Sequence, residues 1–309
     1  MCSSDLAWAA KRLLPGGRLL SAPDRGAMRE MVAFGGKLEV AHAAHLVSLH
    51  ADKLLLSAFL GLTAVAYYDL GSKIAYVMRG LPLLLISATM PAAASIEAMG
   101  DRERLWRFYL SGTRALVFAG TPLLVFTTTG AGAILLAWTG VTALEARQAV
   151  WLLALGYYLN LVSGMANSVA VGIGKPELEM RRSLLAGSLN LGLSAALIPL
   201  LGFAGAPLGT ALALAAGSWY LIHTFNAELG RPLSSVLGLF RGPLAAALPA
   251  AAGAVIVLAL TAGGRSGAIA GLGVAAVLIG VVYLWLGIRN DISSVLLADG
   301  RAWTSRSSS

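Results

Sequence analysis

The sequence predicts an all-α protein, a polytopic bundle of about eight transmembrane helices with both termini on the cytoplasmic side. Hydrophobic residues make up 57% of the 309 residues and charged residues only 12%, whereas a soluble domain carries about 25% charged residues. Apolar runs recur at lengths that can cross a bilayer as a helix, which takes about 20 residues. Basic residues gather in every second connection between these runs, as the positive-inside rule requires.

Eight apolar runs are long enough to span a bilayer. Glycine and proline recur at their ends, and the stretch "LLGFAGAPLG" at 200–209 predicts a tight turn between the fifth and sixth runs. The predicted spans cover residues 32–59, 64–90, 112–137, 147–171, 183–201, 206–225, 243–262 and 268–288.

The basic residues outside the first two spans divide very unevenly between the two sides. The opposite side has only Arg147 and Arg265. This split predicts that both termini are cytoplasmic, and it makes the net charge of +8 a topology signal rather than a nucleic-acid footprint. The 17 basic residues on the predicted cytoplasmic side are Lys11, Arg12, Arg18, Arg25, Arg29, Arg102, Arg104, Arg107, Arg114, Lys175, Arg181, Arg182, Arg231, Arg241, Arg289, Arg301 and Arg306.

The first two spans are unusual because they contain many ionisable side chains. A charged group at mid-membrane costs roughly 2.5–3.5 kcal/mol, so seven of them facing lipid would cost on the order of 20 kcal/mol. At about 100° per residue, the polar groups of each helix occupy one side and leave an apolar back. We therefore expect the two helices to line a shared, water-accessible cavity. The groups are Lys37, Glu39, His42, His45, His50, Asp52 and Lys53 in the first span and Asp69, Lys73 and Arg79 in the second.

A purely structural alternative exists for some of these groups. Asp69 and Lys73 are four residues apart and can pair on one helix face. Lys37, Glu39, Asp52 and Lys53 can also lie near the membrane interfaces. Intramembrane ionisable residues nevertheless more often mark a transport pathway than a structural pair.

No motif indicates an enzyme, a cofactor or a metal site. The stretch "VGIGKP" at 171–176 lacks the first glycine of a phosphate-binding loop, and Pro176 stands where such a loop has Ser or Thr. His42, His45 and Asp52 are too loosely spaced for a metal site without a second cluster. The protein is therefore expected not to be an enzyme and to use no cofactor.

The N-terminal stretch "MCSSDL" is not a signal peptide, because no apolar core and no small-residue cleavage site follow it. It resembles the translation of a sequencing adapter, so the natural protein is expected to begin further upstream. The single cysteine, Cys2, excludes a disulfide within the chain.

The order of several motifs over about residues 30–290 resembles the C-terminal half of polysaccharide flippases of the multidrug/oligosaccharidyl-lipid/polysaccharide exporter (MOP) superfamily. The motifs are "ADKLLLSAFLG", "AVAYYDLGSKIAYV", "LLISATMPAAASI" and "GKPELEMRRSLLAGSLNLGLSAALIPLLGFAGAPLGTALA". The residues at matching places are Asp52, Gly61, Tyr67, Pro91, Ser95, Gly174, Lys175, Asn190, Pro199, Gly202, Gly205 and Ala206.

The resemblance implies a domain organisation. Residues 1–30 would form a cytoplasmic inter-lobe linker with an artefactual start, and residues 31–225 the six-helix C-terminal lobe. Residues 226–290 would add two transmembrane helices and residues 291–309 a cytoplasmic tail. A partner N-terminal lobe would be missing from this sequence.

The resemblance also implies a function in the bacterial cytoplasmic membrane: flipping undecaprenyl-diphosphate-linked sugars or oligosaccharides by alternating access for polysaccharide export. Lys37, Lys53, Lys73 and Arg79 would bind the diphosphate. A proton or sodium ion would be coupled, and the expected coupling residues are Glu39, His42, His45, His50, Asp52 and Asp69. A cation-coupled multidrug exporter of the same superfamily and a non-transporting membrane assembly subunit are the alternatives.

Overall fold

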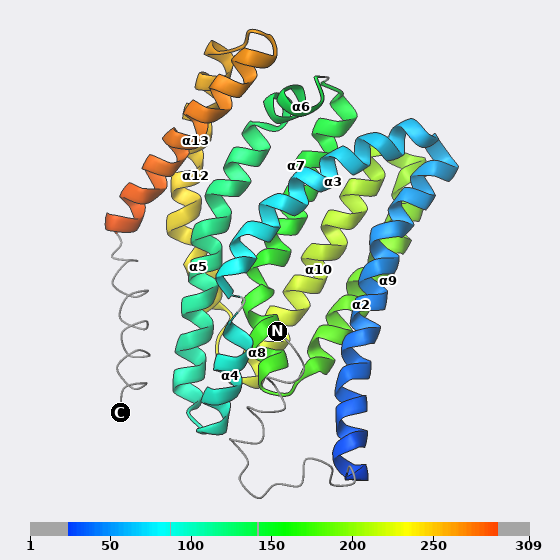
Figure 1. The fold of residues 1–309 in the computed structure, drawn as a ribbon, viewed down its shortest axis with the longest axis vertical. Helices are drawn as coiled ribbons and strands as arrows, with labels where there is room; N and C mark the ends of the chain where they lie inside the picture. Colours follow the sequence, from blue (N-terminus) through cyan, green and yellow to red (C-terminus); the bar gives the residue numbers. More distant parts are fainter. Residues whose placement is uncertain (1–23, 87, 141, 290–309) are drawn as a thin grey trace, which may run out of the picture.

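The computed structural model describes residues 24–86, 88–140 and 142–289, and these residues form helices with no strand among them (Figure 1). Seven described stretches are long and apolar enough to cross a membrane. One of them, Pro176–Glu228, folds back on itself at a 3-10 turn, Gly202–Ala204, and so forms two helices. The predicted polytopic bundle and its eight spans are thus confirmed, and the predicted turn lies where "LLGFAGAPLG" placed it.

The first two spans form an open V. Helix α2 (Arg25–Leu60) ends at Gly61, whose φ of 86° suits glycine, and α3 (Leu62–Leu83) follows directly. Figure 1 shows α2 and α3 meeting at one end of the bundle and diverging toward the other. Along its length α2 packs against α9 (Pro176–Leu201), whereas α3 packs against α7 (Leu144–Val162). Between the arms of the V lie polar groups from both helices, among them His42 and His45 of α2 and Arg79 of α3.

Two spans are interrupted. After Pro82, α3 gives way to a 3-10 turn, Leu84–Ile86, and then to α4 (Thr89–Ala98). Helix α7 breaks at Ser163, and α8 (Gly164–Gly172) continues the span. The two breaks face each other. A Cβ added at Gly164 would lie 3.0 Å from Leu83 Cδ2 and 3.4 Å from Ile86 Cδ1.

The α7–α8 span forms the centre of the bundle, and it is the most buried of the candidate spans. Helices α3, α5 (Arg102–Thr129), α9 and α10 (Gly205–Glu228) pack around it. Contact is closest where a glycine removes a side chain, as at Gly71 of α3, whose added Cβ would lie 2.4 Å from Ala149 Cβ. This close packing holds α3 against α7 and leaves the other side of α3 toward the V.

The C-terminal helices form a pair of their own. Helices α12 (Arg241–Leu260) and α13 (Gly264–Arg289) pack along each other and against α5, and α13 also contacts α6 (Ala131–Thr139). The short α11 (Ser234–Leu237) leads into α12. The division into a six-helix lobe and an extra pair remains a prediction, and most of the predicted linker and all of the predicted tail lie outside the described residues.

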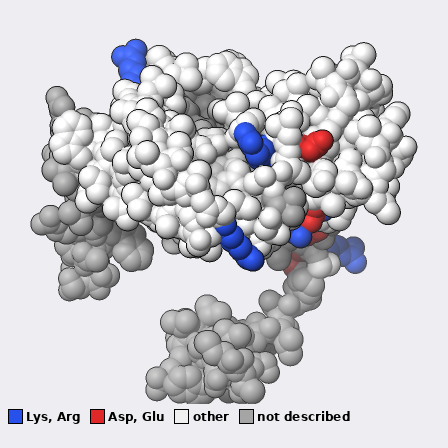
Figure 2. All heavy atoms as spheres, turned by 90° about the horizontal axis from the view of Figure 1, so that it is seen from above, with Lys and Arg blue, Asp and Glu red and all other residues white. Residues whose placement is uncertain are grey.

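Charge differs between the two ends of the bundle. Seen from the end at which α2 meets α3, the surface is mostly uncharged, with few lysines, arginines or acids (Figure 2). At the ends of the helices on that side, Arg265 donates to Ala137 O, and Arg147 lies 5.1 Å from the Trp151 ring centroid. At the other end, the ion pairs Arg231–Glu103 and Lys175–Glu228 join loop residues to the ends of α5 and α10. This distribution agrees with the predicted orientation.

Candidate functional site

A cavity of about 280 Å³ lies between the arms of the V, walled by α2, α3, α7, α8, α9 and α10. It lies in the half of the bundle that contains the end of α3 and the start of α9. Its wall is rich in polar and ionisable side chains, among them His42, His45, Ser48, Arg79, Glu179 and Arg182. We call it the central cavity.

Arg79 is the basic group of the central cavity that pairs with no carboxylate in the part of the chain that the structure describes. Its Nε is buried, and neither a hydrogen bond nor an ion pair joins its side chain to the described residues. The guanidinium lies 5.9 Å from the ring centroid of Tyr76, and Tyr76 makes an edge-to-face contact with Tyr157 at 6.0 Å. Such a cation–π contact positions the charge without neutralising it. Arg79 is therefore available to bind an anion.

Arg182 is the second arginine of the cavity, and it is engaged by Glu179 one turn earlier on α9. Its Nε donates to Glu179 Oε2 at 2.6 Å, and its Nη2 donates to the other carboxylate oxygen. Ser183 Oγ donates to the same carboxylate at 3.0 Å. Both charged side chains are only 13% exposed. With Arg79, the cavity wall has one more positive charge than negative charges.

Of the residues predicted for the site, the structure brings Arg79, His42 and His45 together on this cavity. Glu39 and His50 are exposed and do not line it.

Lys53, Asp69 and Lys73 form a separate cluster near the α2–α3 turn. Asp69 accepts from Lys53 Nζ at 2.6 Å and from Lys73 Nζ at 2.7 Å. The Asp69–Lys73 contact is the i, i+4 pair that the sequence offered as the structural alternative. The cluster joins the two helices where they meet and does not line the central cavity. At the other end of α2, Lys37 Nζ donates to Glu177 at 3.0 Å.

Asp52 is the most deeply buried ionisable residue that the sequence singled out, with no exposed surface. Four side chains from three helices donate to its carboxylate: Tyr68 Oη and Thr210 Oγ1 at 2.6 Å, Ser194 Oγ at 2.7 Å and Asn190 Nδ2 at 3.2 Å. No basic side chain of the described residues forms an ion pair with it. Hydrogen bonds alone therefore stabilise this carboxylate.

Asn190 connects the Asp52 cluster to the central cavity. Its Nδ2 donates to Asp52 and also, at 2.8 Å, to Ser48 Oγ. Ser48 lines the cavity, so a single side chain separates the buried carboxylate from the polar space. The oxygens around Asp52 can exchange protons or bind a hard cation. No group of three or more His, Cys, Asp or Glu residues within the described ranges has metal-binding geometry.

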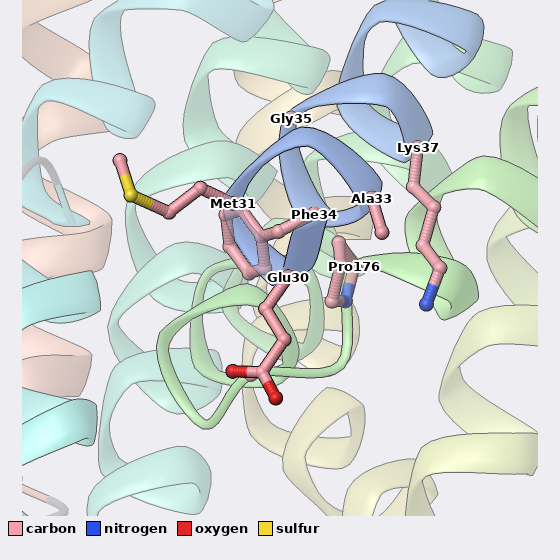
Figure 3. A pocket seen from close by; sticks show the side chains of 8 residues that line it. Glu30, Met31, Ala33, Phe34, Gly35, Lys37 and Pro176 are labelled. Atoms are coloured by element: carbon pink, nitrogen blue, oxygen red, sulfur yellow. The ribbon is translucent and has the colours of Figure 1, made fainter. Parts of the chain in front are cut away.

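A second, larger cavity of about 570 Å³ lies at the start of α2 (Figure 3). Glu30, Met31, Phe34 and Lys37 of α2 line it together with Pro176 of α9. Lys37 is its basic group, and Glu177 already binds the Lys37 ammonium. This cavity therefore lacks the unpaired cation of the central cavity.

Sequence reasoning missed half of the cavity wall. Arg182 was assigned to a cytoplasmic loop, but α9 begins at Pro176, seven residues before the predicted span, so Arg182 lies within the helix. The signal is present in the sequence: Glu179, Arg182, Ser183, Ala186 and Gly187 follow helical spacing, and all line the cavity. Tyr68, Ser194 and Thr210 were missed because ordinary hydroxyl residues in apolar runs resemble packing positions.

We compared the chain with protein families, curated sequences and solved structures. A family model described as "Polysaccharide biosynthesis protein" matches residues 18–147. No curated protein sequence matches the chain.

Among solved structures, the lipid II flippase MurJ in an inward closed conformation aligns with a TM-score of 0.62 at 16% identity, over 85% of this chain and 52% of that one. An outward-facing multidrug resistance MATE family transporter of the MOP superfamily aligns with a TM-score of 0.52 at 16% identity, over 87% and 66%. A MOP superfamily transporter from Pyrococcus furiosus, whose binding pocket is described as having reverse polarity, aligns with a TM-score of 0.51 at 19% identity, over 82% and 62%.

These identities show a shared fold. The matched structures are described as a flippase and as transporters. The chain spans about half the length of the MurJ structure and less than two thirds of the Pyrococcus furiosus transporter.

Proposed function

We propose that the chain moves undecaprenyl-diphosphate-linked sugars or oligosaccharides across the bacterial cytoplasmic membrane, a proposal that the family-model match and the fold shared with a flippase support. The polar headgroup would enter the central cavity while the polyprenyl tail remains in lipid. This function needs an anion-binding hollow inside an apolar bundle, with access from one side at a time.

The unpaired arginine in the central cavity carries the proposal. An arginine inside a membrane bundle is costly unless it meets an anion, a carbonyl or water. Arg79 has no such partner among the described residues, and Arg182 lies on the same cavity wall. One guanidinium group can donate two parallel hydrogen bonds to the oxygens of one phosphate. Two arginines therefore suit the two phosphates of a diphosphate. Lys37, Lys53 and Lys73 enter as secondary basic groups, because each already contacts a carboxylate.

Asp52 is the proposed coupling residue, with His42 and His45 as further proton carriers. A carboxylate held by four neutral donors can take up a proton or exchange its partners for a sodium ion. Its donors come from α3, α9 and α10, so ion binding would change how these helices pack around α2. Asn190 and Ser48 would pass this change to the cavity.

Alternating access would require a second helical lobe to close the V. The exposed apolar side chains of α2 and α3, such as Val47, Leu54 and Val77, face outward and are suited to lipid or to such a lobe. In the proposed cycle this chain supplies one wall of the pathway, and rocking of the two lobes opens it to each side in turn.

The test is transfer of a labelled undecaprenyl-diphosphate sugar between leaflets of proteoliposomes that contain the whole protein. Arg79→Gln should reduce the flipping rate by about 10-fold or more, since a hydrogen bond to a charged group contributes about 1.5–3 kcal/mol. Arg79→Lys should recover only part of it, because lysine cannot bind bidentately. Neutralising Lys53 and Lys73 together should have a smaller effect.

Two outcomes would replace the proposal. Efflux of cationic dyes with no transfer of the lipid-linked sugar would indicate a multidrug exporter. Absence of any transport, together with a fixed complex with glycosyltransferases, would indicate an assembly subunit.

A further inference from the structure

Two asparagines on the central cavity wall have side chains that make no hydrogen bond to any described residue. Asn160 lies in the last turn of α7 and Asn167 in α8, on either side of the break at Ser163. Asn160 is 6% exposed, and no hydrogen bond joins its amide to the described residues. The Oδ1 of Asn167 is buried and likewise unpartnered. Both residues line the cavity that contains Arg79 and Arg182.

Unpaired amides in an apolar bundle need an explanation, because a buried polar group without a partner is costly. The neighbouring Asn190 shows the usual solution, since its amide nitrogen binds Ser48 and Asp52. Asn160 and Asn167 lack such partners, yet they project from the two ends of a helix interruption. Interrupted transmembrane helices occur where their polar groups line a cavity or a binding site.

The chemistry of an amide differs from that of a guanidinium. Arginine only donates hydrogen bonds, so it matches phosphate oxygens, which only accept. An asparagine amide donates through Nδ2 and accepts through Oδ1, and a deprotonated diphosphate offers nothing to Oδ1. A hydroxyl group both donates and accepts. The cavity therefore presents one wall suited to phosphate and another suited to hydroxyl groups.

We propose that Asn160 and Asn167 form a saccharide subsite that hydrogen-bonds hydroxyl groups of the first sugar while Arg79 and Arg182 hold the adjoining diphosphate. This inference rests on the proposed function and extends it to substrate discrimination. The volume of about 280 Å³ is slightly below the ~300–1,000 Å³ of small-molecule pockets. It suits the sugar nearest the diphosphate rather than a whole oligosaccharide, so the subsite would select lipids that carry at least one sugar.

The test compares two ligands by equilibrium binding to the whole protein in lipid nanodiscs: undecaprenyl diphosphate, and the same lipid carrying one hexose. Wild-type protein should bind the hexose-bearing lipid about tenfold more tightly, since two neutral hydrogen bonds contribute about 1.4 kcal/mol, which corresponds to tenfold. The Asn160→Ala/Asn167→Ala variant should bind both lipids equally, with unchanged affinity for undecaprenyl diphosphate. Asn167→Ala alone, at the less buried position, should lose part of the preference and serves if the double variant misfolds.

Asn226→Ala is the matched control. Asn226 is 1% exposed and also unpartnered within the described chain, but it lies outside the central cavity, so its truncation should leave the hexose preference intact. A preference that survives in the double variant would overturn the subsite, as would wild-type protein that binds both lipids equally. In either case the diphosphate binding of the proposed function would stand. If wild-type protein bound neither lipid, the proposed function would fall, and the subsite with it.

Discussion

Asp52 illustrates how hydrogen bonds can satisfy a fully buried carboxylate that has no cationic partner among the described residues. Tyr68, Asn190, Ser194 and Thr210 each donate to it, and charge-assisted hydrogen bonds of this kind are about twice as strong as neutral ones. The sequence identified Asp52 as a candidate, but not the four donors. They lie between 16 and 158 positions away, and no local pattern joins them.

Asp52→Asn should abolish the dependence of flipping on an ion gradient. The amide cannot take up a proton, and its NH2 group would face donors, which should also lower the free energy of unfolding by about 1–3 kcal/mol. Flipping rates in proteoliposomes with imposed proton or sodium gradients measure the first effect. Asp69→Asn is the comparison, because Asp69 is paired with two lysines away from the cavity. Gradient dependence that persists in Asp52→Asn but vanishes in Asp69→Asn would reassign the coupling residue.

Glu179 competes with any anionic ligand for Arg182. Glu179→Gln removes the charge that engages this arginine but keeps a hydrogen-bond acceptor, so affinity for undecaprenyl diphosphate should rise by about 3- to 10-fold, which corresponds to ~0.7–1.4 kcal/mol and is less than the ~1.5–3 kcal/mol of a whole hydrogen bond to a charged group. Binding titrations in nanodiscs measure it. Glu228→Gln removes a carboxylate from a more exposed ion pair with Lys175 and should change nothing. Equal or weaker binding in Glu179→Gln would show that Arg182 does not contact the ligand.

At the scale of elements, α3 has two glycines with opposite surroundings. A Cβ at Gly71 would lie 2.4 Å from Ala149 Cβ and 3.0 Å from the backbone of Val150, whereas Gly80 has nothing within 4 Å. Gly71→Ala should therefore push α3 away from α7 and destabilise the protein by about 1–3 kcal/mol. Gly80→Ala should be neutral or stabilise by up to about 1 kcal/mol. Thermal unfolding in detergent distinguishes them, and equal effects would contradict the described packing.

The helices themselves were predictable because long apolar runs have few alternatives in a membrane. The starts of helices were harder, as α9 shows. "PELEMRR" is polar enough to suggest a loop, yet its residues form the first turns of α9, and Arg182 turns inward. The breaks near Leu84 and at Ser163 were also missed, because a continuous apolar run does not reveal that two interrupted helices contact each other.

At the scale of the whole molecule, the charge asymmetry predicts that both termini lie on the cytoplasmic side, and thiol labelling can test this orientation. In a Cys2→Ser background, Ser266→Cys lies in the first turn of α13 and Gly100→Cys in the α4–α5 connection. A membrane-impermeant thiol reagent should label Ser266→Cys in intact cells and Gly100→Cys only after permeabilisation. The reverse pattern would invert the predicted topology and place the central cavity at the outer side.

The proposed function depends on anion binding by the central cavity. The most direct measurement is the dissociation constant of undecaprenyl diphosphate for wild-type protein and for Arg79→Gln/Arg182→Gln in nanodiscs. Arg102→Gln/Arg107→Gln, which removes the same charge from exposed positions on α5, is the control. We expect the cavity variant to bind at least about 10- to 100-fold more weakly, and the control to bind as wild type. Unchanged affinity in the cavity variant would contradict binding of the diphosphate by Arg79 and Arg182 in the central cavity.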